Sequence, residues 1–390
     1  MSRLADLIEE LCPDGVEYKP LGEVAELKRG QSITKKSITP GDIPVIAGGR
    51  KPAYFTSSAN RTGMTIVVAG SGAYAGFVSY WDQPIFVSDA FSVKVNEKIL
   101  VPRFTYHWMC GKQKELYSLK SGGGVPHVYP KDVAKFKCPI PPLEVQCEIV
   151  RILDQFTTLE VELEVELEAR RVQYEYYRNQ LLSYDALASR GPVEWLKLGE
   201  VGEFVRGSGL QKSDFVDEGL PCIHYGQIHT RFGIAADEAV ANISVMQFHR
   251  LKHANHGDLL IATTSEDDEA VGKATVWLGQ EEVAIGGDMF IFRHVLEPKY
   301  VSYFFASSLF GDQKRPYITG TKVRRISEKG LSRIRIPVPS IEEQRRIADV
   351  LDRFDALVND ISSGLPAEIA ARRTQYEYYR DRLLSFPEKK

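Results

Sequence analysis

An internal duplication constrains the fold of this chain more than any other sequence feature. Residues 16–30 are matched by residues 193–207, which lie 177 positions later, and both segments contain Leu-Gly-Glu-Val followed by Arg-Gly. A run of the form Arg-Arg-x-Gln-Tyr-Glu-Tyr-Tyr-Arg begins at Arg170 and again at Arg372, 202 positions later. A period of about 200 residues is too long for a solenoid repeat. We therefore expect two copies of one domain-plus-helix unit with pseudo-twofold symmetry.

The two copies differ most in their middles. Residues 121–141 are matched by residues 319–339 at a distance of 198 positions, so the middle of the second copy is 21 residues longer. Four more residues are added before the second Arg-Arg run. Each copy is thus a variable middle enclosed by similar ends, and specificity can reside in the variable part.

Composition indicates that the middles are strand-rich globular domains. They contain many Gly, Pro, β-branched and aromatic residues, with short strand-like runs such as residues 65–69 and 259–263. The chain is 43% hydrophobic and 26% charged, which suits a protein with more than one core and excludes fibrous and disordered classes. We predict the α+β fold class.

The segment that follows each domain has helical periodicity. Apolar residues in 149–163 and in 347–361 alternate steps of three and four, which predicts a coiled-coil seam. Gly364 and Pro366 should interrupt the second helix. Two ordinary amphipathic helices are the alternative, but matching stripes favour antiparallel packing of the two copies. The expected boundaries are an N-terminal helix at 1–14, domains at 15–142 and 192–339, and helical spacers at 143–185 and 340–386.

The net charge of −3 conceals a basic first domain. Residues 15–142 contain 17 Lys and Arg against 9 Asp and Glu, whereas residues 143–185 contain 4 against 10. Residues 192–339 contain 17 against 19, yet eight of those cations lie between Lys314 and Arg335. Both domains therefore offer basic surface.

Cysteine usage and hydropathy indicate the compartment. The five cysteines are odd in number and include no C-x-x-C pair, which argues against a disulfide framework and a thiolate metal site. Residues 62–81 lack charge, but their glycines and serines favour a strand pair over a membrane span. Acidic residues near the start leave no signal-peptide core. We expect a cytoplasmic protein.

Motifs of enzymes are incomplete in this sequence. The Gly-rich run 69–76 lacks the third glycine of a dinucleotide loop and the Lys of a phosphate loop. Residues 82–86 only faintly resemble the catalytic motif of amino-methyltransferases. Three histidines, His249, His253 and His256, would share one face of a continuous helix, but Gly257 follows at once and a structural role is favoured over zinc or phosphate contact. For the acidic run 266–269, a solvated loop is the first interpretation and acceptance from a cytosine amino group the alternative.

Loops of both domains fit nucleic-acid recognition better. They combine cations, hydrogen-bonding side chains and glycines that permit close approach. The predicted contact residues are Arg50, Lys51, Tyr54, Ser71, Tyr74, Lys120 and His127 in the first domain, and Lys212, Tyr225, Gln227, His229, Arg231, Ser265, Lys273, Lys322, Arg324 and Arg325 in the second.

The whole chain resembles a known family. Residues 141–146 (Pro-Pro-Leu-Glu-Val-Gln), residues 339–344 (Pro-Ser-Ile-Glu-Glu-Gln) and the paired Gln-Tyr-Glu-Tyr-Tyr-Arg runs are similar to the specificity (S) subunit of type I restriction-modification systems. Val145 and residues 340–341 depart from that family's helix-start motif. The resemblance implies two target-recognition domains, each reading half of a bipartite double-stranded DNA site, separated by two long helices that pack as an antiparallel coiled coil.

The resemblance also implies partners. Two modification (methyltransferase) subunits dock on the helices, restriction subunits join the complex, and no membrane is involved. The chain itself has no catalytic residues, metal or cofactor, because S-adenosylmethionine is bound by the partner. Residues expected to serve helix packing or partner contact, and not base stacking, are Gln146, Tyr174, Tyr177, Gln344, Tyr376 and Tyr379. A standalone adenine methyltransferase and a coiled-coil adaptor without a DNA role remain as alternatives.

A short tandem repeat lies inside the first helical spacer. Residues 161–164 and 165–168 both read Val-Glu-Leu-Glu, where the second copy is longer by four residues. Gain or loss of one such unit changes a helix by about 6 Å and nearly preserves the phase of its apolar stripe. We expect this helix to set the DNA spacer between the half-sites; a plain solvated Glu-rich helix is the alternative.

Overall fold

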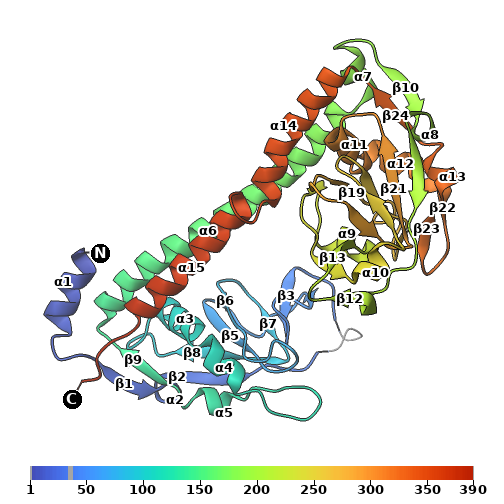
Figure 1. Ribbon diagram of the computed structural model, residues 1–390. Coiled ribbons are helices and arrows are strands. Elements are labelled where there is room, and N and C mark those ends of the chain that lie inside the picture. The colour runs from blue at the N-terminus through green and yellow to red at the C-terminus, as the bar shows by residue number, and fades with distance from the viewer. Residues whose placement is uncertain (1, 34–37, 390) are drawn as a thin grey trace. The chain divides into compact units, whose positions relative to one another are not determined.

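The computed structural model describes residues 2–33 and 38–389 and divides into two compact units. Unit 1 comprises residues 1–164 and 368–390, and unit 2 comprises residues 165–367. Each unit contains one strand-rich domain together with parts of the long helices (Figure 1).

Two sheets form the domain of unit 1. Antiparallel strands make a four-stranded sheet of order β2-β8-β5-β6, and β5 is buried along its whole length. A smaller sheet has the order β4-β3-β7, with β3 and β7 parallel. The pair β1 and β9 joins the two ends of the domain. The strands are β1 (Glu17–Pro20), β2 (Ala25–Arg29), β3 (Ile43–Ile46), β4 (Tyr54–Thr56), β5 (Thr65–Ala69), β6 (Val78–Trp81), β7 (Phe86–Val87), β8 (Ala90–Val95) and β9 (Lys137–Ile140).

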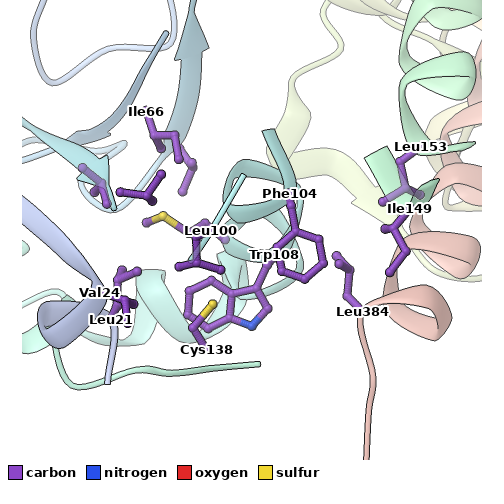
Figure 2. Close-up of a cluster of buried hydrophobic side chains, with 14 of the residues drawn as sticks. Leu21, Val24, Ile66, Leu100, Phe104, Trp108, Cys138, Ile149, Leu153 and Leu384 are labelled. Carbon is purple, nitrogen blue, oxygen red and sulfur yellow. The ribbon is translucent and has the colours of Figure 1, made fainter. Parts of the chain in front are cut away.

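Helix α3 connects the sheet of unit 1 to the long helices. Its residues Phe104 and Trp108 are buried between Leu100 and Ile66 on one side and Ile149 of the long helix α6 on the other (Figure 2). The helices that contribute to this unit are α1 (Ser2–Leu11), α2 (Leu21–Val24), α3 (Pro102–Gly111), α4 (Gln113–Ser118), α5 (Pro130–Val133), the first part of α6 (Leu143–Leu181) and most of α15 (Leu365–Leu383).

The domain of unit 2 has the same framework with additions. Its main sheet has the order β11-β21-β17-β19-β14, and a second sheet has the order β12-β15-β13-β20-β16. A three-stranded sheet has the order β18-β23-β22, and β10 pairs with β24. The strands are β10 (Glu194–Lys197), β11 (Gly202–Arg206), β12 (Phe215–Val216), β13 (Leu220–Ile223), β14 (Ala235–Ala236), β15 (Ala241–Ile243), β16 (Lys252–Ala254), β17 (Leu259–Ala262), β18 (Thr264–Ser265), β19 (Ala274–Trp277), β20 (Val283–Ile285), β21 (Met289–His294), β22 (Ile318–Thr319), β23 (Arg324–Ile326) and β24 (Arg335–Val338).

Helices complete unit 2. Helix α11 packs on the main sheet and against α14, as α3 packs on its sheet in unit 1. The helical elements of this unit are α7 (Tyr184–Ala188), α8 (Leu198–Val201), the 3-10 turn η2 (Lys212–Asp214), α9 (Tyr225–Thr230), α10 (Val245–Phe248), α11 (Pro298–Phe305), α12 (Ser308–Lys314), η3 (Arg315–Tyr317), α13 (Glu328–Leu331) and α14 (Ile341–Asn359), with the second part of α6.

The two long spacers differ in continuity. Helix α6 runs for 39 residues, but it ends at Leu181 because the hydroxyl of Ser183 caps the separate helix α7 by accepting from Ala186 N–H. The second spacer is interrupted between α14 and α15, as predicted. At Gly364 a Cβ atom would lie 2.4 Å from the carbonyl oxygen of Ala356, so this turn requires glycine.

Antiparallel helix packing is present in each unit, which confirms the predicted coiled-coil arrangement. In unit 1, Phe156 of α6 stacks on Tyr379 of α15 with ring centroids 5.3 Å apart, and Arg373 forms an ion pair with Glu160 at 2.5 Å. In unit 2, Tyr177 of α6 stacks on Phe354 of α14 at 5.4 Å.

No helix among the described residues is long and apolar enough to cross a membrane. The uncharged residues 62–81 form β5, a turn and β6.

Candidate nucleic-acid interface

A cavity of about 1180 Å³ in unit 2 gathers most of the predicted contact residues of the second domain. Elements from across the domain line it, including η2, α9, β18 and the loop after β18. Of the residues predicted from sequence, it brings together Lys212, Tyr225, Gln227, His229, Arg231, Ser265 and Lys273. The lining therefore offers cations, aromatic faces and amide groups to one ligand.

Helix α9 positions the polar side of this cavity. The contact residues of this segment are predicted to lie in a loop, but the segment is a short helix, whose start His224 and Gln227 stabilise as a capping box. Nδ1 of His224 accepts from Gly226 N–H at 3.2 Å, and Oε1 of Gln227 accepts from His224 N–H at 2.8 Å. The Gln227 oxygen is thus engaged in the fold, while its amide nitrogen stays available for a ligand.

Two further groups hold α9 in place. The imidazole Nε2 of His229 lies 3.1 Å from the carbonyl oxygen of Thr264, and Nζ of Lys273 donates to the carbonyl oxygen of His229 at 3.3 Å. Burial lowers the pKa of Lys273. Burial thus disfavours the charged form of this lysine, and an anion placed beside it would favour that form.

A basic hairpin formed by β22 and β23 borders the same cavity through Val323. Arg324 is engaged within the protein: its Nε lies 2.9 Å from Oδ1 of Asp268 and its Nη1 donates to Gly320 O at 2.6 Å. Lys322 and Arg325 are exposed and form no ion pair within the described part of the chain. Among the three predicted cations, Arg324 therefore braces the hairpin and the other two face solvent.

The acidic run 266–269 forms an exposed loop beside that hairpin. Its end is fixed by Lys314, a buried residue whose Nζ donates to the carbonyl oxygens of Glu269 and Val271 at 2.6 Å. Burial lowers the pKa of Lys314 to about 8, against the opposing effect of the nearby acidic groups. The loop is thus held in shape while the side chains of Glu266 and Asp267 line the cavity.

A smaller cavity of about 340 Å³ lies in unit 1, at the end of β5 beside the start of β8. His127 and Tyr129 line it with Arg29, whose guanidinium lies 5.5 Å from the Tyr129 ring centroid. Ser71 is buried beside it, and its hydroxyl donates to Asp89. Only His127 among the predicted residues lines this cavity.

The other predicted residues of the first domain lie on neighbouring loops. Arg50 stacks over the exposed ring of Tyr74 at 4.8 Å, and Lys51 is exposed next to it. Tyr54 donates its hydroxyl to the carbonyl oxygen of Ile33 at 2.9 Å, and Lys120 Nζ donates to the carbonyl oxygen of Ala73 at 2.7 Å. Tyr54 and Lys120 thus support loops in addition to any ligand contact.

Sequence reasoning missed Arg29 and Asp89 in unit 1. The Arg-Gly pair was recognised as part of the duplication, but its arginine was not assigned to a site. The signal lies in the adjacent glycines: a Cβ atom at Gly30 would lie 2.1 Å from Ser88 O, and one at Gly207 would lie 2.0 Å from Gly286 O. This close backbone approach closes the same corner of each domain.

The three histidines considered for a metal lie outside a helix. Helix α10 ends at Phe248, and His253 belongs to β16. Nε2 of His253 lies 2.7 Å from Phe248 O and Nδ1 of His256 lies 3.0 Å from Leu278 O. His253 thus ties β16 to the end of α10, and His256 contacts the residue that follows β19.

Glutamines at the starts of α6 and α14 tie each helix to its domain. Gln146 is fully buried; its Oε1 accepts from Val101 N–H, and its Nε2 donates to Ile99 O and Pro141 O, each at 2.8 Å. Gln344 repeats the arrangement, with Oε1 accepting from Glu297 N–H at 3.0 Å and Nε2 donating to Pro339 O at 2.9 Å.

Tyrosines of the Gln-Tyr-Glu-Tyr-Tyr-Arg runs lie on the helix pairs. Tyr376 is buried and its hydroxyl lies 2.8 Å from Nδ1 of His107 in unit 1, whereas Tyr174 is buried and donates to Oδ1 of Asp355 at 3.1 Å in unit 2. Tyr379 is partly buried. Tyr177 keeps 39% of its surface exposed while it stacks on Phe354.

In unit 1 a polar cluster of Arg103, His107 and Asp154 joins α3 to α6, and we call it the first latch. In unit 2 a matching cluster of Lys299, Tyr303 and Asp352 joins α11 to α14, and we call it the second latch. In the first latch, Oδ1 of Asp154 accepts from Arg103 Nε at 2.7 Å and contacts His107 Nε2 at 2.8 Å. In the second latch, Asp352 accepts from Lys299 at 2.6 Å and from the Tyr303 hydroxyl at 2.7 Å.

Comparison with known proteins identifies the family. Residues 13–170 and 192–371 match the family described as type I restriction modification DNA specificity domain. The chain is 31% identical to the EcoR124I/EcoR124II specificity subunit of Escherichia coli, covering 99% of this chain and 98% of the relative. It is 28% identical to a putative type I restriction enzyme specificity subunit of Haemophilus influenzae, covering 95% and 96%.

Two solved structures share the fold. The S subunit of the type I restriction-modification system from M. genitalium gives a TM-score of 0.56 at 16% identity, covering 95% of this chain and 96% of that one. A chain from a structural study of complex assembly and conformational transition of the type I restriction-modification system gives a TM-score of 0.58 at 22% identity, covering 95% and 98%. Sequence matches over both halves thus show that the chain belongs to the family of type I restriction-modification specificity subunits.

Proposed function

We propose that this chain is the DNA-reading component of a type I restriction-modification complex, in which each domain recognises one half of a bipartite double-stranded DNA site. The observation that carries the proposal is the duplication of one framework with different loop chemistry. Strand order β2-β8-β5-β6 recurs as β11-β21-β17-β19, while the equivalent loops at residues 121–127 and 319–325 differ in residue type. Equal frameworks with unequal recognition surfaces suit a site with two different halves.

Paired surfaces on the helices support two copies of one partner. Tyr176 of α6 and Tyr378 of α15 occupy equivalent positions, and both are exposed. Each meets the next tyrosine edge-on, with ring centroids 5.4 Å apart. Exposed tyrosines are frequent anchors in protein interfaces. We infer that each tyrosine helps to dock one modification subunit, and that restriction subunits join the complex through those partners.

The catalytic step belongs to the partners in this proposal. S-adenosylmethionine is bound by the modification subunits, and this chain supplies sequence recognition without a catalytic residue or cofactor of its own. The complex acts on chromosomal and invading DNA in the cytoplasm. The incomplete methyltransferase motif at residues 82–86 supports this division of labour, since Asp82 and Gln83 are exposed on the turn between β6 and β7.

Methylome sequencing tests the proposal. The host genome is sequenced for modified bases with the modification subunits present and this chain present or deleted. We expect one bipartite motif whose methylation requires this chain. If the motif is still methylated after this chain is deleted, another protein recognises the site. Binding of labelled S-adenosylmethionine to the isolated chain would favour a standalone methyltransferase, and normal methylation with unchanged DNA mobility would favour an adaptor role.

A further inference from the structure

Both domains contain a short hairpin of the same loop length at equivalent positions. Residues 121–127 in unit 1 correspond to residues 319–325 in unit 2. Ser121 and His127 exchange backbone hydrogen bonds at 3.0 and 2.8 Å, and Thr319 pairs in the same way with Arg325. Each hairpin therefore has a loop of five residues between its closing pair.

A glycine fixes the shape of each loop. Gly122 has a φ of +114° and Gly320 a φ of +93°, in the region that other residues rarely adopt. A Cβ atom would lie 3.0 Å from Val125 O at the first position and 2.1 Å from Val323 O at the second. Both loops therefore turn tightly between the glycine and the valine that follows three residues later, and the valine lies directly after the turn.

The base of each hairpin is anchored at the same corner of its domain. Val128 N–H donates to Gly70 O at 3.0 Å, just after β5. Ile326 N–H donates to Thr263 O at 3.1 Å, just after β17. Since β5 and β17 are central strands of equivalent sheets, each hairpin is a rigid projection from the domain core.

An exposed valine lies in the loop of both hairpins. Val125 is 56% exposed and Val323 is 48% exposed. A single exposed apolar residue needs no explanation, but its recurrence on two rigid hairpins does. The neighbouring residues differ completely: two glycines precede Val125, whereas Thr321 and Lys322 precede Val323. Glycine and valine are thus the features that both loops share.

The surroundings of these valines favour DNA as the ligand. Lys322 and Arg325 flank Val323, and Lys120 and His127 lie beside the first hairpin. Val323 also lines the large cavity with Tyr225 and Lys273. An apolar side chain between cations matches a groove, in which phosphates border base edges and thymine methyl groups.

We propose that each hairpin enters a groove of its half-site, where Val125 and Val323 make the apolar contact to base edges. This inference rests on the proposed DNA-reading function and assigns a specificity-determining residue to each domain. The flanking cations contact phosphates and hold the hairpin in register. The two valines then act independently, each on its own half-site.

The test uses the complete complex with its modification subunits and a bipartite DNA duplex. Binding is measured for Val125→Ala and Val323→Ala with the cognate duplex and with duplexes altered at single base pairs of either half-site. Loss of two buried methyl groups should weaken cognate binding about tenfold. Each variant should also discriminate less at base pairs of one half-site and normally at the other, and the two variants should affect opposite half-sites.

Matched variants keep the result interpretable. Val295→Ala removes an 84% exposed valine away from the hairpins and should leave affinity and discrimination unchanged. Val323→Ile should retain most of the affinity because it keeps an apolar side chain in the loop. Unchanged discrimination in both alanine variants would overturn the inference, as would a loss of complex assembly in place of base discrimination. If the unaltered complex itself fails to distinguish half-site changes, the proposed DNA-reading function fails instead.

Discussion

The two domains use one framework but different chemistry, and the contrast is clearest where each meets its helices. In unit 1 the latch contains Arg103 and His107 against Asp154; in unit 2 the equivalent positions are Lys299 and Tyr303 against Asp352. A carboxylate on a long helix is therefore held in both units by one cation and one ring. The geometry is kept while the residue types change.

The difference matters because the imidazole of His107 can gain a proton on acidification, whereas the phenol of Tyr303 has no such proton to gain. With Asp154 ionised, Nε2–H of His107 donates to it and Nδ1 accepts from the Tyr376 hydroxyl, so a neutral imidazole satisfies both partners. Burial lowers the pKa of His107, although the hydrogen bond to Asp154 opposes it. Burial raises the pKa of Tyr303, so the hydroxyl of this tyrosine keeps its proton in the latch of unit 2.

The domains differ also in size, which shows where variation is tolerated. Unit 2 has β14 added to its main sheet and β12 and β16 added to its second sheet. These strands lie at sheet edges, so the additions leave the central strands and the anchored hairpins unchanged. Recognition surfaces can thus diverge while the attachment to the helices is retained.

The largest expected effect comes from changing the helix that both units share. Deleting residues 165–168 removes one turn of α6 and shortens it by about 6 Å. At about 3.4 Å per base pair, we expect methylation to be lost at the original sites and gained at sites whose spacer is shorter by nearly two base pairs. Methylome sequencing would show both half-sites unchanged. Altered half-site bases, or an unchanged spacer, would mean that the helix does not set the spacing.

The glutamines test whether the two attachments are energetically alike. Gln146→Ala leaves one buried N–H and two carbonyls without partners, so we expect a loss of about 2–4 kcal/mol in the free energy of unfolding. Gln344 makes two such bonds, so Gln344→Ala should cost about 1–3 kcal/mol. Urea unfolding with exposed Gln83→Ala as control measures the difference. Equal effects for all three variants would rule out the attachment role.

Acid should destabilise both units, through different histidines. Burial lowers the pKa of His294 to about 4, although a backbone contact with Leu296 opposes the shift. Below about pH 6.5 this histidine therefore binds a proton in the unfolded chain but not in the folded chain. Its contribution to the free energy of unfolding is constant above that pH and falls as the pH decreases toward about 4. The loss should reach about 3 kcal/mol for this histidine.

Two variants separate the contributions. His294→Phe should remove the acid loss of unit 2, and Tyr303→His should introduce a new loss between pH 7 and 5 by giving the second latch a titratable ring. Thermal unfolding between pH 4 and 8 measures both. A Tyr303→His variant with an unchanged pH profile would show that the latch chemistry is not coupled to stability.

The smallest expected effect concerns the exposed cations of the second hairpin. Replacing Lys322 and Arg325 by alanine should weaken binding to the half-site read by domain 2 and lower the slope of log affinity against log salt by about 2. Including Arg324 should add a structural loss, since it braces the hairpin through Asp268. A salt slope that stays the same in the double variant would place these cations away from phosphates.

Duplication and periodicity predicted the framework because both are repeated, local patterns. The interruption at Gly364 followed from backbone sterics, and antiparallel packing followed from matched apolar stripes. Sequence did not predict that residues as distant as Lys212 and Ser265 line one cavity. Strand order brings them together, and no local pattern encodes it.

The roles of individual polar residues were also beyond sequence reasoning. Arg324 and Gln227 are predicted contact residues, and each also serves the fold: Arg324 pairs with Asp268 and Gln227 caps α9. A cationic or amide side chain in a loop has the same sequence signature whether it contacts a ligand or another residue of the protein. Only the position of a partner such as Asp268 separates the two roles.

A domain transplantation tests most directly the claim that each domain reads its own half-site. Residues 25–133 are replaced by residues 202–331, so that the framework of unit 1 carries the recognition loops of unit 2, and the host methylome is sequenced. We predict a new motif with two identical, inverted halves, each equal to the half-site of domain 2 in the original motif. Retention of the original asymmetric motif by this variant would contradict the account.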